Sequence, residues 1–153
     1  VFRMRLAFVL FLLTWINTSH AYKILVFTPS FSQSINNYLG NIADTLVDAG
    51  HNVTVVIPIV NPVLRDGSHK ANKIYVQPTE EVKKITASMD FEEADFFVYN
   101  DFNALISIPF GWDFIGWVNA QCKGVLDEPG LVERLKNEKY DVVIVENFET
   151  CGV

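Results

Sequence analysis

The stretch that decides the fold runs from Tyr22 to Val60 and reads YKILVFTPSFSQSINNYLGNIADTLVDAGHNVTVVIPIV. Its two ends, Tyr22 to Pro29 and Asn52 to Val60, are rich in β-branched and other apolar residues, which predicts two buried strands. Between them, apolar residues recur at helical spacing, at Leu39, Ile42, Ala43, Leu46 and Val47. They form one helix face, and Gly50 ends the helix. Strand, helix and strand in about forty residues predict a right-handed βαβ unit with parallel strands.

The alternation of strands and helices continues towards the C-terminus. Lys73 to Gln77 predicts a short third strand, and residues 78–81 (PTEE) open a helix. Gly130 to Glu138 predicts another helix, and Tyr140 to Glu146 a further buried strand. This order indicates an α/β domain, doubly wound around a parallel sheet.

Residues 1–21 are typical of a secretory signal peptide. Arg3 and Arg5 precede an apolar run from Leu6 to Ile16, and small residues follow up to Ala21. The run is too short to span a bilayer. We therefore expect cleavage after Ala21 and entry into the secretory pathway, the alternative being a buried first helix.

The secretory pathway bears on two further features. In an oxidising lumen Cys122 and Cys151 can form a disulfide or remain free buried thiols, and the sequence does not decide between them. Asn52-Val53-Thr54 is an N-glycosylation sequon. Alternatively, Thr54 belongs to a strand and the sequon is not glycosylated.

Composition and missing motifs exclude several classes of function. The chain has 153 residues and a net charge of −6, which becomes −8 without the two arginines of the signal. That charge disfavours nucleic acid as a partner. No G-x-G-x-x-G follows the first strand, which argues against a dinucleotide site. The phosphate loop, C-x-x-C, H-E-x-x-H and G-x-S-x-G motifs are also missing, and no metal site is expected.

The segment from Ile85 to Gln121 has nine aromatic residues and no lysine or arginine. Phe110, Phe114 and Trp117 stand at i, i+4 and i+7, so they share one helix face. Core packing is the first interpretation of each single aromatic. As a group they also suit an apolar cavity for a small aglycone.

Two separated motifs resemble one known family. Tyr22 to Val60 closely resembles the start of the UDP-glycosyltransferases of the UDP-glucuronosyltransferase type, and Tyr140 to Gly152 (YDVVIVENFETCG) resembles a later strand. Asn41 to Val56 is most similar to nematode members. The resemblance implies a GT-B glycosyltransferase in which residues 22–153 are part of the N-terminal Rossmann-like, acceptor-binding domain. It also implies that the C-terminal UDP-sugar domain and a transmembrane anchor lie outside these residues, and that this fragment alone is inactive.

The family's activity follows from the resemblance as an expectation. It is an inverting transfer of a glucuronosyl or glucosyl group from UDP-glucuronate or UDP-glucose to small lipophilic acceptors. The UDP-sugar would be held by the C-terminal half, so this chain binds no cofactor of its own. The implied location is the lumen or membrane of the endoplasmic reticulum, and the anchor would attach the protein to the membrane. The resemblance leaves open whether the protein forms homo-oligomers.

The resemblance also implies two catalytic positions. In the family, a histidine after the first strand deprotonates the acceptor hydroxyl, and a carboxylate after a later strand orients that imidazole. The carboxylate position falls on Glu146, and the histidine position on Ile35, which cannot accept a proton. His51 is a poor substitute, because a helix from about residue 36 to 49 is roughly 20 Å long and places it at the far end.

The remaining polar residues of this segment are candidates for acceptor binding. Ser34, Asn36 and Gln33 can hydrogen-bond an acceptor but are not bases near pH 7. The isoleucine at position 35 motivates a second hypothesis. In it the protein is a catalytically inactive relative that acts as a small-molecule binding or regulatory module.

Overall fold

Four short strands pair in parallel to form the sheet of this protein. The computed structural model describes residues 21–88, 104–146 and 151. The strands are β1 (Lys23–Phe27), β2 (Asn52–Pro58), β3 (Asn72–Val76) and β4 (Val142–Val145), in the order β3-β2-β1-β4. The α/β fold class is thereby confirmed, and each strand lies within one residue of, or inside, its predicted range. The prediction that the last strand is buried is wrong for its first half, because β4 is an edge strand of the described sheet and Val142 and Val143 are exposed.

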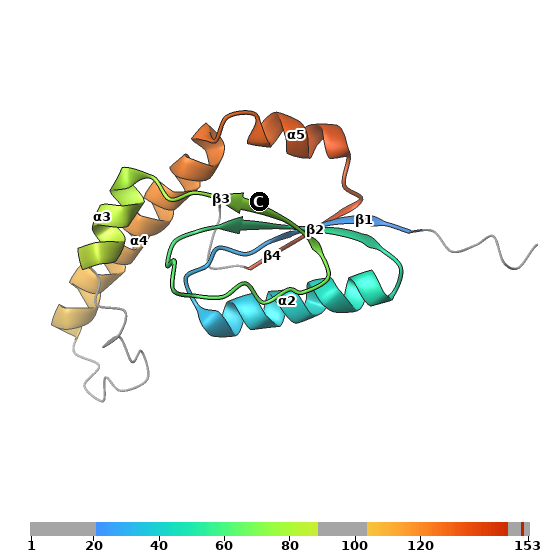
Figure 1. Cartoon of the computed structure of the whole chain (residues 1–153). Helices are drawn as coiled ribbons and strands as arrows, with labels where there is room; N and C mark the ends of the chain where they lie inside the picture. Colours follow the sequence, from blue (N-terminus) through green and yellow to red (C-terminus); the bar gives the residue numbers. More distant parts are fainter. Residues whose placement is uncertain (1–20, 89–103, 147–150, 152–153) are drawn as a thin grey trace, which may run out of the picture.

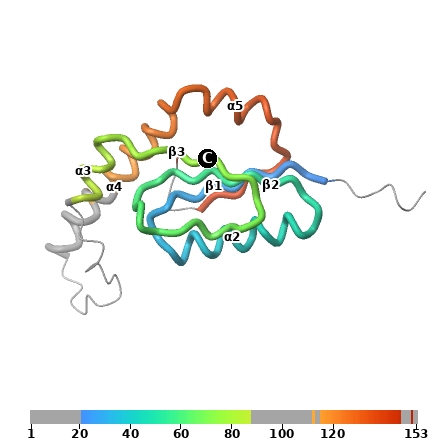
Figure 2. Tube along the Cα trace, viewed as in Figure 1, coloured from blue at the N-terminus to red at the C-terminus, as the bar shows by residue number. Residues whose placement is uncertain are grey.

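Helices cover both faces of this sheet. They are α2 (Gln33–Asp48), α3 (Glu80–Ser88), α4 (Ala104–Asp127) and α5 (Leu131–Glu138). Helix α2 lies along one face and α5 along the other, while α3 and much of α4 lie beyond one end of the sheet (Figures 1 and 2). The predicted doubly wound arrangement is therefore correct for the described residues.

Alternation along β1 explains how one strand serves two cores. Ile24 and Val26 pack with α2, whereas Leu25 and Phe27 pack with the end of α4 and with α5. A parallel strand that is buried on both faces reads as a continuous apolar run. Such a run is what the sequence shows from Ile24 to Phe27.

The connection from β2 to β3 runs alongside α2 (Figure 1). Residues 59–71, all of which the structure describes, contain no helix. A Cβ atom on Gly40 would lie 2.1 Å from the carbonyl carbon of Gly67, and one on Gly67 would lie 1.8 Å from the Asn36 carbonyl oxygen. The backbones of α2 and the connection therefore touch directly, and only glycine fits at either position.

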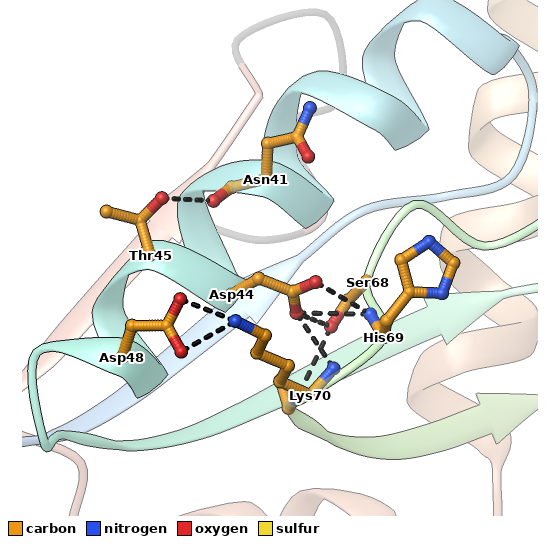
Figure 3. Close-up of polar contacts among 8 residues, drawn as sticks. Asn41, Asp44, Thr45, Asp48, Ser68, His69 and Lys70 are labelled. Carbon is orange, nitrogen blue, oxygen red and sulfur yellow. Dashed lines mark hydrogen bonds and ion pairs between the residues drawn. The ribbon is translucent and has the colours of Figure 1, made fainter.

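Asp44 joins the same connection to α2 (Figure 3). Its carboxylate accepts hydrogen bonds from the Ser68 hydroxyl at 2.6 Å and from the backbone amides of His69 and Lys70 at 2.9 and 3.0 Å. Burial alone would raise the pKa of Asp44, but these bonds outweigh it and lower the pKa from 3.8 to about 2. One turn later, Asp48 forms an exposed ion pair with Lys70.

A disulfide fixes α4 to the chain that follows β4. Cys122 and Cys151 are bonded, with their Cα atoms 5.2 Å apart. The alternative of two free thiols, which the sequence leaves open, is therefore wrong in this structure. Cys151 also packs against the core between the sheet, α4 and α5.

We predict that Asp44→Asn lowers stability at neutral pH by about 1 to 2 kcal/mol, because the neutral amide keeps one acceptor oxygen but loses the charge-assisted bonds. The folded pKa lies below the unfolded value. This contribution is therefore present above about pH 4 and is lost as the pH falls towards 2. Urea unfolding between pH 2 and 7 measures both effects.

Asp48→Asn is the matched control, since it removes a carboxylate of the same helix that forms an exposed ion pair with Lys70. It should cost less than about 0.5 kcal/mol. Equal losses for the two variants would contradict the role assigned to Asp44.

We predict that replacing Cys122 and Cys151 together by serine lowers the free energy of unfolding by about 3 to 4 kcal/mol. The bond closes a loop with a sequence separation of 29, and opening it enlarges the unfolded ensemble. Thermal melts with and without a reductant check this. The reductant should destabilise the wild type and leave the double variant unchanged.

Candidate active site

The strand order creates a switch point between β1 and β4. From β1 the chain adds β2 and then β3 on one side, whereas β4 pairs with the other side of β1. Open α/β sheets bind ligands beyond the carboxyl ends of their strands at such a point. Two segments leave the sheet there: residues 28–32, which lead into α2, and Glu146, which follows β4.

The segment after β1 is held rigidly. Ser30 is buried, and its backbone amide donates to the Pro58 carbonyl at 2.9 Å. The Ser30 hydroxyl accepts from the Val60 amide at 3.0 Å, and the Ser30 carbonyl accepts from the Asn61 amide at 3.0 Å. These bonds extend the pairing of β1 with β2 past the strand ends and fix the position of residues 28–32 at the carboxyl edge.

The polar residues predicted to contact an acceptor lie in the first turn of α2. Gln33 accepts from the Arg65 amide at 3.0 Å and donates to the Arg65 carbonyl at 3.1 Å. Asn36 is 1 % exposed and also donates to the Arg65 carbonyl, at 3.1 Å. Both amides thus fix the β2–β3 connection, whereas Ser34 is exposed to solvent. The acceptor-binding roles of Ser34 and Asn36 stay predictions.

The two predicted catalytic positions lie at the same edge of the sheet. Phe27 pairs with Val145, so Glu146 stands level with Thr28, where β1 ends. Glu146 is half-buried. Ile35, in the first turn of α2, packs against the core between α2 and the sheet. The structure therefore gives this apolar side chain a packing role, and its assignment as the position of the base stays a prediction.

Histidines lie at the opposite edge. His51 directly precedes β2 and His69 precedes β3, and parallel strands start at the same edge. His51 accepts a hydrogen bond from the Tyr22 amide at 3.4 Å. The prediction that His51 lies at the wrong end of α2 is confirmed. Within the described residues, neither histidine can reach Glu146, and His20 lies outside them.

The predicted aromatic face falls in α4. Trp117 is 1 % exposed, donates to the Thr86 hydroxyl at 3.2 Å and contacts the Phe31 ring edge-on, with centroids 6.0 Å apart. It packs with Val60 and Val82 in a core between α3, α4 and the sheet edge. Phe110 and Phe114 belong to α4, but their side chains lie outside the described part. The role of these three residues in acceptor binding stays a prediction.

An open cavity of about 550 Å³ lies beside this core. It sits at the carboxyl ends of β2 and β3, and Ser30 connects it to the segment after β1. Most of its lining is apolar and includes Ile57, Ile59, Val60, Pro62 and Leu64. Sequence reasoning missed this cavity, because nothing in the run from Ile57 to Leu64 distinguishes a cavity wall from a buried strand.

One wall of the cavity carries a charged cluster. Asp66 accepts hydrogen bonds from the Tyr75 hydroxyl and from Lys73, whose ammonium nitrogen lies 2.8 Å from its carboxylate. Burial would raise the pKa of Asp66, but the bonds from Lys73 and Tyr75 lower it. The bond to Asp66, together with burial, raises the pKa of Tyr75 to about 12. The carboxylate therefore stays ionised and the phenol neutral near pH 7.

In residues 21–88, 104–146 and 151, no three histidine, cysteine or acidic side chains lie close enough together to hold a metal ion. In the same part of the chain, no helix has the length and apolar character needed to cross a bilayer.

Comparison with known proteins accords with this geometry. Residues 22–153 match the family model described as UDP-glucoronosyl and UDP-glucosyl transferase. The chain is similar to the putative UDP-glucuronosyltransferase ugt-46 of Caenorhabditis elegans, with 31 % identity over 97 % of this chain and 28 % of that protein. It is also similar to human UDP-glucuronosyltransferase 2B15, with 26 % identity over 85 % of this chain and 25 % of the relative.

Human UDP-glucuronosyltransferase 3A2 gives a similar result, with 29 % identity over 92 % of this chain and 27 % of that protein. The chain thus spans about a quarter of the length of these relatives. No solved structure matches it significantly. From the family match over residues 22–153 and the Rossmann-like fold that accompanies it, we conclude that this chain belongs to the UDP-glucuronosyl and UDP-glucosyl transferase family.

Proposed function

We propose that this chain is the acceptor-binding part of a UDP-glycosyltransferase. The enzyme transfers a glucuronosyl or glucosyl group, with inversion, from a UDP-sugar to a small lipophilic acceptor. The UDP-sugar binds to a domain outside residues 22–153, and the acceptor binds at the carboxyl edge of the sheet described above. The observation that carries the proposal is the position of Glu146, level with the end of β1 at the switch point.

The cavity supports the lipophilic character of the acceptor. Its volume of about 550 Å³ falls in the range of small-molecule sites, and its lining is mainly apolar. Among the described residues of that lining, Asp66 and Lys83 are charged; Asp66 is paired with Lys73, and Lys83 with Glu80. A neutral aromatic alcohol such as a phenol fits this combination, because it can bury its ring without leaving a charge unpaired.

We predict that Leu64→Glu weakens the binding of 1-naphthol to this chain by roughly tenfold or more. The substitution places a carboxylate on the apolar wall of the cavity. Isothermal titration calorimetry measures the affinity. Val63→Glu is the matched control, because Val63 is 84 % exposed and does not line the cavity. Equal affinities for the two variants would place the acceptor elsewhere.

This proposal does not yet assign a catalytic base. The resemblance puts the family's histidine position at Ile35, which packs against the core, and the described histidines stand at the opposite edge. An apolar residue at that position motivates a second candidate function, in which the protein binds the acceptor without transferring sugar to it. The two candidates differ in whether restoring an imidazole at position 35 creates activity.

We predict that Ile35→His raises glycosyl transfer by about 100-fold or more, in line with the usual contribution of a general base. The assay uses a chimera in which this chain replaces the matching segment of human UDP-glucuronosyltransferase 2B15, with UDP-glucuronate and 1-naphthol. His51→Ala is the control and should leave the rate unchanged, since His51 lies at the amino edge. A parent chimera as active as the variant would show that another group is the base.

The proposal extends to the cellular location. We propose that residues 1–21 are removed as a signal peptide and that the protein resides in the lumen or membrane of the endoplasmic reticulum. The disulfide between Cys122 and Cys151 suits an oxidising compartment. Asn52, the proposed glycosylation site, is exposed at the start of β2, on the edge opposite Glu146. A glycan there would leave the carboxyl edge clear.

A further inference from the structure

Gln121 of α4 is a buried polar side chain that has no role in the function proposed above. It is 4 % exposed. Neither its amide nitrogen nor its amide oxygen makes a hydrogen bond to any part of the chain that the structure describes. Buried amides of folded proteins almost always have partners, because an unpaired one loses its bonds to water without replacement.

A small cavity lies next to this amide. It measures about 10 Å³ and is separate from the large cavity described above. Gln121 and Gly124 of α4 form one side of it, and Pro58, Gln77 and Thr79 are on the others. One water molecule needs about 10 to 15 Å³, so this cavity is about the size of a single water.

The backbone geometry explains why the protein itself does not fill this space. Gly124, one turn after Gln121, brings α4 close to the start of α3. A Cβ atom at Gly124 would lie 2.8 Å from the Thr79 methyl group. Thr79 in turn accepts a hydrogen bond from the Val82 amide at the first turn of α3. These contacts fix the spacing of the two helices and leave a gap that Gln121 helps to line.

We propose that this small cavity is a binding site for one buried water molecule, held by Gln121. The site lies where the carboxyl ends of β2 and β3 meet α3 and α4, so the water links the helix pair to the sheet. Most of its lining is apolar, but Gln77, Thr79 and Gln121 supply polar groups and its volume is that of one water molecule. Three of its lining residues, Ile59, Gln77 and Pro78, also line the large cavity. The water therefore lies directly behind the wall of that cavity.

Two measurements on the chain test this proposal, and both must agree with it. A crystal structure should show density for a water oxygen within hydrogen-bonding distance of the Gln121 amide. Gln121→Leu, which removes the polar atoms at similar volume, should lower the melting temperature, because it deprives the water of its main partner. Asn119→Leu is the control; Asn119 is exposed on the same helix and should melt as the wild type does.

The opposite results overturn the proposal. A small cavity without density would mean that Gln121 is an unpaired amide. In that case Gln121→Leu should melt at a higher temperature than the wild type, because burying an apolar side chain there removes the cost of desolvating the amide. The melting experiment therefore gives shifts of opposite sign for the two cases and does not depend on crystals.

Discussion

The direct backbone contact between Gly40 and Gly67 is the constraint on which the site depends. It lets the β2–β3 connection lie against α2. The Asp44 carboxylate then accepts hydrogen bonds from the Ser68 hydroxyl and the His69 amide of that connection. With the connection in place, Gln33 and Asn36 hold Arg65. The same connection supplies Leu64 and Asp66 to the cavity wall. Any larger residue at position 67 would separate these parts, because no side chain can yield in a backbone contact.

The parallel sheet decides which candidate residues can lie close together, because residues that follow strands and residues that precede strands lie at opposite edges. Glu146, Ser30 and the first turn of α2 follow strands, so they lie at the carboxyl edge. His51 and His69 precede strands and lie at the amino edge. A proton acceptor and the residue that orients it must stand within hydrogen-bond reach of each other. Within the described residues, the topology places His51 and His69 at the amino edge and position 35 near the carboxyl edge. A substitution at Ile35 could therefore bring an imidazole to the carboxyl edge.

Most of the fold was predictable because its signals are local. Apolar runs gave the strands, and the spacing from Leu39 to Val47 gave the buried face of α2. The helix starts at Gln33, before the predicted position, because its polar first turn is stabilised by Arg65, which is distant in sequence. Asn36 was predicted to contact an acceptor, but its amide bonds the same connection. The sequence pattern could not show either contact, since both join segments about thirty residues apart.

The sequence by itself determined the family and the α/β class, because these rest on periodicity and on motifs that are contiguous along the chain; its two catalytic positions stay predictions. Only the tertiary structure decided that Cys122 is bonded to Cys151, that Asp44 is a structural carboxylate, and that a cavity opens beside β2. It also left Gln121, whose amide is buried, beside a space of water size. Each of these depends on distances between elements, which the packing of α2, α3 and α4 sets and which composition does not encode.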